Sequence, residues 1–190
     1  SKEMQTPNID ALTSEGVVFT DAHVAATVSS PSRACLITGR YGHRFGYECN
    51  LSDRTNGLPL EEETIAEVFK TNGYRTAAIG KWHLGSRDEQ HPNNRGFDLF
   101  YGMKAGGRDY FYNEKKSDRP GDERNLLLND RQVKFEKYLT DAFSEKAVEF
   151  INESSQPFMM YLAYNAVHTP MQATDEDMAC LLYTSDAADE

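Results

Sequence analysis

The sequence predicts an α/β protein with a mainly parallel sheet and helices on both faces of that sheet. Helical and extended patterns alternate along the chain, which implies crossover connections between parallel strands. The composition supports a packed core, because 39% of the 190 residues are hydrophobic and 11% are aromatic. No apolar run approaches the roughly 20 residues of a membrane-spanning helix, so we expect a globular chain of about one domain and no membrane partner.

The first three elements follow from the positions of proline and glycine. Pro7 and Gly16 suit the first turn and the end of a short helix. The β-branched and aromatic run at 17–20 is typical of a strand. A second helix is predicted at 30–39, because Ser-Pro begins it and a terminal glycine accepts the positive φ of a helix end.

The helix predicted at 60–72 has the clearest pattern of the first half. Its first turn is acidic, its last turn carries a lysine, and Gly73 follows it, as the helix dipole and capping preferences favour. Ile65, Val68 and Phe69 predict its buried face.

Later strands are predicted at 74–80, 96–101 and 158–164, with a helix at 140–153. The side chains expected to point inward from that helix are Phe143, Ala147, Val148 and Ile151. Residues 102–130 form a long polar excursion, as binding loops do.

Charge and cysteine content exclude some classes of protein. The formal net charge of −10 argues against a nucleic-acid partner, which would need clustered lysine and arginine. It says little about a small anionic substrate, which feels only the local site. Cys35, Cys49 and Cys180 form no zinc-binding or disulfide pattern, and Cys35 is most simply a small core residue.

The two ends of the sequence carry separate expectations. Residues 180–190 match the translation of a transposon end and adaptor used in sequencing libraries, so we expect about 179 native residues and exclude 180–190 from fold prediction. The alternative is a native acidic tail. The sequence begins at Ser1, with neither an initiator methionine nor a signal segment. We therefore expect an internal start, with any signal peptide outside this chain.

Three loops that follow predicted strands carry reactive or cationic side chains. The first holds Ser29 and Arg33 at a helix start, the second Lys81 and His83, and the third His168. Each loop taken alone has a structural explanation: the first is a helix cap, the second a solvated loop and the third a turn that contains a histidine. Ligands of such sheets bind beyond the carboxyl ends of the strands, so together the loops predict a site for a tetrahedral oxyanion.

Several segments resemble the type I sulfatases of the alkaline phosphatase superfamily. Residues 29–40 (SSPSRACLITGR) resemble the signature (C/S)-x-P-S-R-x-x-x-x-T-G-R. Residues 80–85 (GKWHLG) and 161–170 (YLAYNAVHTP) resemble the second signature and the strand and histidine segment, and 6–22 fits the opening helix and strand. The resemblance implies that 1–179 is a partial, incomplete catalytic domain of alkaline phosphatase-like fold, lacking the first strand and the C-terminal part.

The resemblance also implies a role for each residue of the three loops. Ser29 matches the residue oxidised to formylglycine, whose hydrated aldehyde attacks sulfur and is a ligand of Ca²⁺ (or Mg²⁺). Arg33 would hold the diol, and His83 would orient it. Lys81 and His168 would bind the sulfate oxygens, and one of them would assist the leaving alcohol. Serine at this position fits the maturation route of anaerobic bacteria and implies a formylglycine-generating maturase as partner.

The sequence departs from the family in its metal ligands. The family's paired aspartates, and its Asp/Asn pair with a lysine, match no position here, and Asp21, Asp98 and Asp109 are not substitutes. Since Ca²⁺ needs about six oxygen ligands, the modified Ser29 is the only ligand that we nominate. We expect this polypeptide neither to hold its metal nor to turn over.

Two further groups are candidates for substrate contacts. Arg40, His43 and Arg44 form an anionic-substrate subsite or, alternatively, a structural arginine with solvated neighbours. A contact with a sugar is a hypothesis for three residues of the polar excursion, Arg108, Asp109 and Tyr110.

The function that the resemblance implies is hydrolysis of sulfate esters, on a sulfated glycan or an aryl sulfate. One alternative is a phosphate or phosphonate ester hydrolase of the same superfamily, which would use Ser29 unmodified or oxidised. Another is a non-catalytic sulfate-binding relic. Periplasmic or secreted placement is the family's expectation.

Overall fold

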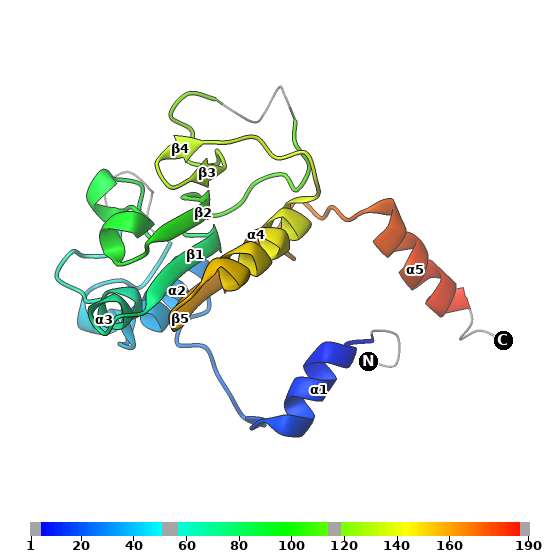
Figure 1. Ribbon diagram of the computed structural model, residues 1–190, viewed down its shortest axis with the longest axis horizontal. Helices are drawn as coiled ribbons and strands as arrows, with labels where there is room; N and C mark the ends of the chain where they lie inside the picture. Colours follow the sequence, from blue (N-terminus) through cyan, green and yellow to red (C-terminus); the bar gives the residue numbers. More distant parts are fainter. Residues whose placement is uncertain (1–4, 51–56, 114–118, 187–190) are drawn as a thin grey trace. The chain divides into compact units, whose positions relative to one another are not determined.

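The computed structural model describes residues 5–50, 57–113 and 119–186 of the chain. It divides into two compact units, one comprising residues 1–24 and 173–190 and the other residues 25–172 (Figure 1). None of the helices in the described part of the chain combines the length and apolar composition that a membrane crossing requires.

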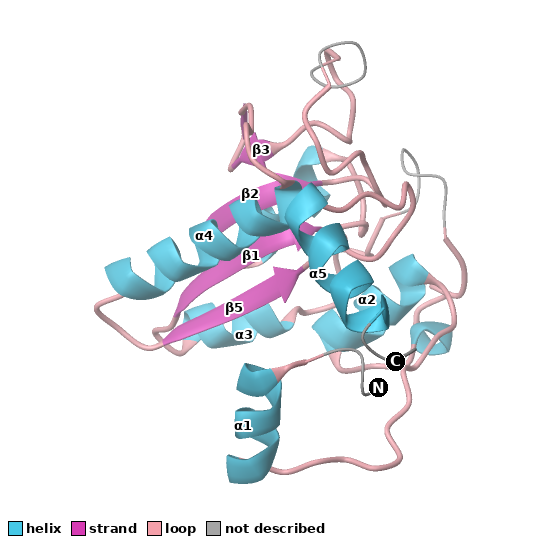
Figure 2. Ribbon diagram, turned by 90° about the vertical axis from the view of Figure 1, so that its right-hand side faces the viewer, coloured by secondary structure: helices cyan, strands magenta, loops and turns pink. Residues whose placement is uncertain are grey.

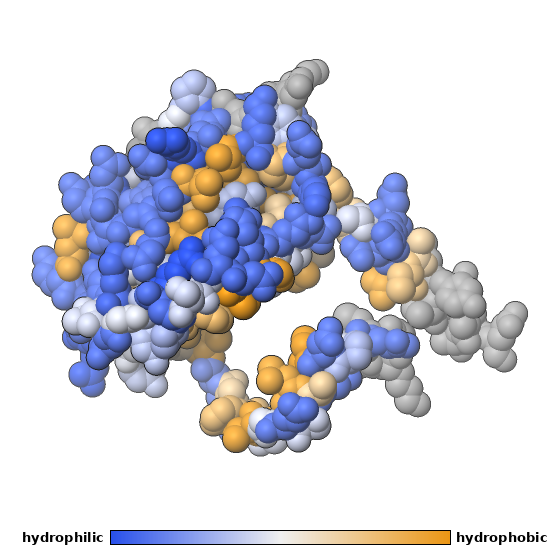
Figure 3. All heavy atoms as spheres, in the orientation of Figure 1, coloured by the Kyte–Doolittle hydropathy of each residue, from blue (hydrophilic) through white to orange (hydrophobic). Residues whose placement is uncertain are grey.

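The first unit contains helix α1, Pro7–Glu15, which the sequence predicts correctly from its proline and from Gly16 at its end. The strand predicted at 17–20 is absent, and the segment has no regular structure. Val17 and Phe19 are 84% and 79% exposed, and Figure 3 shows apolar surface on the part of the chain that contains α1. A strand is stable only when it pairs, and no described strand pairs with this segment.

The same unit contains helix α5, Asp175–Asp186. Asp175, Glu176 and Asp177 lie in its first turn, where the helix dipole favours acidic side chains. The Thr174 hydroxyl accepts a hydrogen bond from the main-chain N–H of Asp177, at 3.1 Å. The helix continues past residue 180, whereas the sequence predicts no helical period there. The origin of residues 180–190 stays a prediction.

The second unit is built on a five-stranded sheet with the strand order β4-β3-β2-β1-β5. The strands are β1 (Arg75–Lys81), β2 (Leu99–Met103), β3 (Leu127–Leu128), β4 (Arg131–Gln132) and β5 (Phe158–Ala163). The three longest are parallel, because β1 pairs in parallel with both β2 and β5, while β3 and β4 add an antiparallel hairpin. The predicted mainly parallel α/β fold is therefore confirmed.

Helices cover both faces of this sheet (Figure 2). On one face lies α4, Leu139–Glu153, and on the other lie α2, Ser29–Thr38, and α3, Ile65–Thr71. Alternate residues of β1 divide between the two layers, as the pleat of a strand requires. Ala77 and Ile79 pack in the layer of α4, and Ala78 packs in the layer of α2 and α3.

The buried stripe of α4 differs from the predicted one. Phe143 and Ala147 are buried as predicted, but Val148 and Ile151 are 56% and 41% exposed. The residues that complete the buried stripe are Leu139, Ala142 and Phe150. This set repeats every three to four residues along one face, whereas Val148 lies nearly opposite that face and Ile151 lies beside it.

Helix α3 is shorter than predicted, because it begins at Ile65 rather than at residue 60. Thr64 is its N-cap and forms a capping box with Glu67, in which each side chain bonds the other's main-chain N–H. Ala66 is buried in the core, while Ile65 and Val68 are 41% and 42% exposed. The predicted apolar face is therefore wrong for these two residues.

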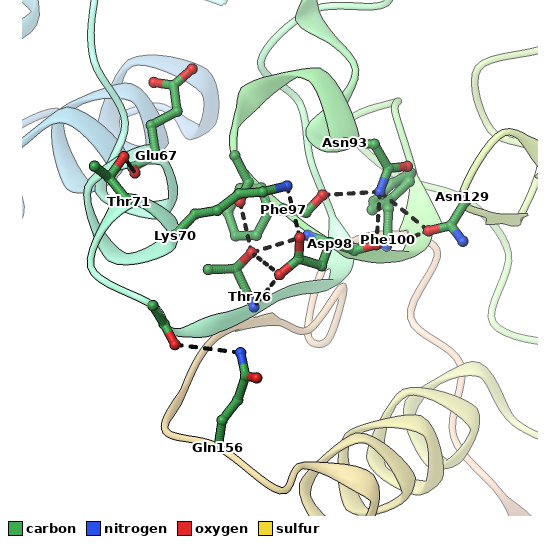
Figure 4. A network of polar contacts seen from close by, with 12 residues as sticks. Glu67, Lys70, Thr71, Thr76, Asn93, Phe97, Asp98, Phe100, Asn129 and Gln156 are labelled. Atoms are coloured by element: carbon green, nitrogen blue, oxygen red, sulfur yellow. Dashed lines mark hydrogen bonds and ion pairs between the residues drawn. The ribbon is translucent and has the colours of Figure 1, made fainter.

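A polar network fixes the starts of β1 and β2 (Figure 4). The buried Thr76 hydroxyl donates to the carbonyl of Gly96 at 2.7 Å, and the Thr76 N–H donates to Asp98 Oδ2 at 3.0 Å. Lys70 of α3 forms an ion pair with Asp98 at 2.7 Å. Burial raises the pKa of Asp98, but hydrogen bonds from Lys70 and Thr76 outweigh it and lower that pKa overall. Asp98 thus links strand and helix.

Candidate active site

The first turn of α2 lies at the carboxyl end of β1. Ser29 is the first residue of α2, and Lys81 is the last residue of β1. The Arg33 guanidinium joins the two elements, because its Nη1 donates to the Lys81 carbonyl at 2.8 Å. Strand and helix therefore present their functional side chains at one point.

The Ser29 hydroxyl is the centre of this arrangement. Its Oγ lies 3.0 Å from Nδ1 of His83, and it accepts a hydrogen bond from Nε of Arg33 at 3.3 Å. Ser29 and Arg33 are four residues apart, so they share one face of the helix. The structure thus places a hydroxyl between a cation and an imidazole at a helix N-terminus, where main-chain dipoles favour an anion.

Lys81 adds a second cation to the site. Its side chain is 4% exposed, and none of the ion pairs among the described residues includes it. Burial, and second the charge of Arg33, lower the pKa of Lys81 to about 8. A buried ammonium beside a guanidinium is electrostatically unfavourable until an anion joins it.

A glycine pair after β2 lies against the rings of both His83 and His168. A Cβ at Gly106 would lie 2.7 Å from the His83 ring, and one at Gly107 would lie 3.0 Å from Nδ1 of His168. The loop therefore contacts both rings and leaves no room for side chains. Nδ1 of His168 lies 2.7 Å from the Thr169 carbonyl, which can only accept, so this nitrogen carries the proton. In the neutral ring Nε2 is then the free base.

The structure adds Tyr161 of β5, which the sequence reasoning did not single out. Its hydroxyl accepts a hydrogen bond from Nη1 of Arg33 at 2.9 Å. Burial has the largest effect on the pKa of Tyr161 and raises it, although Arg33 acts in the opposite direction. A tyrosine within an apolar strand was the available signal, because a buried hydroxyl needs a polar partner.

Arg108 and Tyr110 are buried, whereas Asp109 between them is partly exposed. Arg108 is buried, donates to the Arg124 carbonyl at 2.7 Å and lies 4.6 Å from the centre of the Phe135 ring. The Tyr110 hydroxyl donates to the His168 carbonyl at 2.9 Å. Arg108 Nη1 and the Tyr110 hydroxyl thus bond within the protein, and the contact with a sugar stays a hypothesis.

Arg40 and His43 are not brought to the site. Nη1 of Arg40 lies 2.5 and 2.6 Å from the two carboxylate oxygens of Glu62. Arg40 follows the C-terminal end of α2, about 14 Å along the helix from Ser29 at 1.5 Å per residue. His43 and Arg44 are exposed in a short 3₁₀ helix, Gly42–Arg44. The ion pair with Glu62 favours the alternative of a structural arginine with solvated neighbours, and the anionic subsite stays a prediction.

Comparison with known proteins agrees with this geometry. The family model described as "Sulfatase" matches residues 1–179. The chain belongs to the sulfatase family. Its α/β fold is likewise that of sulfatase structures, as the mixed sheet and its helices show.

Similar proteins include both enzymes and structures of this family. The chain is 37% identical to the "Uncharacterized sulfatase YdeN" of Escherichia coli (strain K12), over 88% of this chain and 33% of that protein. It is 37% identical to Arylsulfatase G of Mus musculus, over 89% of this chain and 38% of that protein. The crystal structure of Ps i-CgsB superposes with a TM-score of 0.85 at 42% identity, over 93% of this chain and 43% of that chain. The sulfatase chain thus spans about a third of the length of these curated relatives.

The described residues contain no cluster of side chains that matches the metal site expected of a sulfatase. No group of three or more histidine, cysteine, aspartate or glutamate side chains there is arranged to hold a metal ion. Asp98 is committed to Lys70 and Thr76, and Asp109 accepts from Gln172 at 3.5 Å. The described residues therefore fit the binding of an anion, and the expected lack of metal ligands stays a prediction.

Proposed function

We propose that the protein is a sulfuric ester hydrolase and that this chain supplies its nucleophile position and its sulfate-binding cations. The observation that carries the proposal is the Ser29 hydroxyl, 3.0 Å from His83 and 3.3 Å from Arg33 at the first turn of α2. Membership in the sulfatase family and the burial of Lys81 beside the charge of Arg33 support it.

The described cations suit a developing negative charge. Arg33 bonds to Ser29 and to the Lys81 carbonyl, and its charge acts on the buried Lys81 ammonium. Such preorganised charge stabilises a transition state more than flexible surface cations do, because it needs no reorganisation. Arg33 also donates to Ser29 and to Tyr161, which fixes the plane of its guanidinium.

Proton transfer is assigned to Lys81 and His168. Lys81, with a pKa of about 8, is mostly protonated at neutral pH and close enough to its titration to donate to a leaving alcohol. His168 is held by the Thr169 and Tyr110 contacts, with Nε2 available to bind or accept a proton. His83 orients the oxygen at position 29 through Nδ1.

Ser29 is the proposed position of formylglycine, formed by a maturase in a bacterial host. When present, formylglycine supplies a geminal diol, one hydroxyl of which attacks sulfur. The residues around Ser29 fit such a group, because Arg33 and His83 approach its oxygen from two sides. A Ca²⁺ (or Mg²⁺) ion would need ligands other than the described residues, so we assign no step to it.

A sulfated glycan is the proposed substrate class. Ps i-CgsB was crystallised with a neocarrahexaose, and that structure superposes on this chain with a TM-score of 0.83 at 40% identity. The structure of BT4656, 26% identical with a TM-score of 0.75, contains D-glucosamine-2-N,6-O-disulfate. These neighbours support a sugar sulfate as the substrate class.

The test expresses the full-length gene with a maturase and examines the peptide containing Ser29 by mass spectrometry. We expect the loss of two hydrogens at Ser29, and turnover of a sulfate ester well above that of the phosphate ester of the same alcohol. Ser29→Ala should abolish turnover, whereas Ser14→Ala, an exposed serine of α1, should not change it. Dominant phosphatase turnover would support the phosphate ester hydrolase instead.

A further inference from the structure

The main chain of His83 has an uncommon conformation. Its φ is +56°, in the left-handed region that favours glycine. In the described part of the chain, Asn129 is the other non-glycine residue with positive φ. A side chain is kept in this region only where its surroundings hold it there, and such residues concentrate at functional sites.

Hydrogen bonds hold both main-chain groups of His83. Its N–H donates to the Lys104 carbonyl at 3.0 Å, in the loop after β2. Its carbonyl accepts from the Ser30 hydroxyl at 2.6 Å. Ser30 is 3% exposed, so this bond is shielded from water, which otherwise competes for both groups.

Tyr47 continues this chain of hydrogen bonds, and its direction follows from proton count. The Ser30 hydroxyl has one proton, and the His83 carbonyl can only accept, so Ser30 must donate to it. The Tyr47 hydroxyl, 2.7 Å from Ser30 Oγ, is therefore the donor to Ser30. Tyr47 is 2% exposed and packs in the same core cluster as Trp82 and Leu84, the neighbours of His83 in the chain.

Adjacent serines thus bind two parts of one histidine. Ser29 meets the His83 ring at Nδ1, while Ser30 binds the His83 carbonyl. Successive helix residues point about 100° apart, which lets the two hydroxyls reach different groups. The Ser30 N–H also donates to Asn50 Oδ1 at 2.8 Å, so the turn itself is tied down.

We infer that Ser30 and Tyr47 are positioning residues, whose hydroxyls hold the His83 main chain in its left-handed conformation and thereby place Nδ1 against the oxygen at position 29. The consequence for turnover rests on the proposed function, but the hydrogen-bonded arrangement does not. Without these hydroxyls His83 relaxes to an ordinary φ, and its ring leaves Ser29.

The experiment uses the 190-residue chain labelled with ¹⁵N, including the histidine rings. The variants are Ser30→Ala and Tyr47→Phe, with Ser30→Thr as the substitution that keeps the hydroxyl. Thr76→Val is the matched control, because Thr76 is also fully buried and donates to a carbonyl at 2.7 Å, but at the other end of β1. The readouts are the Nδ1 resonance of His83 and the exchange rate of its main-chain N–H.

We expect Ser30→Ala and Tyr47→Phe to move the His83 Nδ1 resonance and to speed exchange of its N–H about tenfold. Ser30→Thr should restore both, and Thr76→Val should lower stability without moving either. An unchanged Nδ1 resonance in folded Tyr47→Phe would overturn the inference, as would an equal change in Thr76→Val. Tyr47→Phe keeps the test decisive if Ser30→Ala does not fold.

Turnover separates this inference from the proposed function. In the full-length protein, Tyr47→Phe should lower kcat about tenfold or more with KM within about twofold, because misplacement of a catalytic group affects chemistry first. If the unaltered chain fails to bind inorganic sulfate, the proposed function is contradicted. The Nδ1 resonance of His83, measured without ligand, would still show whether Ser30 and Tyr47 hold the His83 main chain in place.

Discussion

The burial of Lys81 lowers its pKa, and this should make anion binding depend on pH. Burial and then Arg33 lower its pKa to about 8, against about 10.4 in an unfolded chain. Charged Lys81 therefore costs stability at neutral pH, and this cost falls as the pH rises above about 8 and is gone above about 10.4. A bound sulfate has the opposite effect, because it favours the charged form.

We therefore expect inorganic sulfate to bind this chain with an affinity that is constant below about pH 7 and falls up to tenfold per unit above about pH 8. Isothermal titration calorimetry across this range measures it. Lys81→Met should bind weakly with little pH dependence. Lys104→Met is the control, because its ammonium donates to the Ser86 carbonyl at 2.7 Å. Equal affinity at pH 7 and 9.5 would refute the role of Lys81.

The sequence identified the residues of the site that carry distinctive chemistry. Lys81 and His83 lie at and after the end of a correctly predicted strand. Ser29 and Arg33 lie in α2, although the strand predicted before them is absent, and the structure brings all four residues together. Tyr161 and the Gly106–Gly107 pair were missed, because their part depends on which ring or guanidinium packs against them. These contacts depend on how the strands pair and on the course of the loop after β2, and no short sequence motif specifies either.

Gly80 governs how β1 delivers Lys81 and His83 to the site. Its φ is +110°, and a Cβ there would lie 2.1 Å from the Ala163 carbonyl of β5. It pairs with Gly102 of β2 on the other side, so the three strands approach closely at this level. A side chain would have to displace main-chain atoms.

Gly80→Ala should lower the free energy of unfolding by about 3 kcal/mol, from the left-handed backbone and from the overlap with β5. Gly73→Ala separates these contributions, since Gly73 has φ +82° but open space around its Cβ, and should cost only about 1–2 kcal/mol. Urea denaturation measures both. Equal losses would show that the Ala163 contact is unimportant.

Elements were predictable where local pattern and tertiary pairing agree. Strands β1 and β5 and helix α2 lie close to their predicted bounds. The segment at 17–20 has strand composition but no described partner strand, and the β3–β4 hairpin lies at the end of the polar excursion, where composition indicates a loop. In both cases the outcome depends on pairing with another strand, which the local sequence does not determine.

The chain as a whole is expected to bind an anion without binding the metal. The described residues offer two cations at Ser29 but no cluster of metal-ligating side chains. A site with a Kd of roughly 10 µM would stabilise the chain by about 2.7 kcal/mol at roughly 1 mM Ca²⁺.

We expect no such stabilisation by Ca²⁺ in thermal denaturation, relative to a sample with a chelator. Inorganic sulfate should raise the melting temperature of the same sample. The full-length sulfatase is expected to respond to both ions. A Ca²⁺-dependent rise in the melting temperature of this chain would contradict the assignment of metal ligands to other residues.

The strand order also has a consequence for handling the chain. Among the described residues β5 pairs on one side only, with β1, and its sequence FMMYLA contains no charge and no proline. Charged residues and prolines are what usually prevent a free strand edge from pairing with another molecule. We therefore expect purified chain to self-associate through β5 as its concentration rises, which sedimentation velocity would detect, and Met159→Lys to reduce this association.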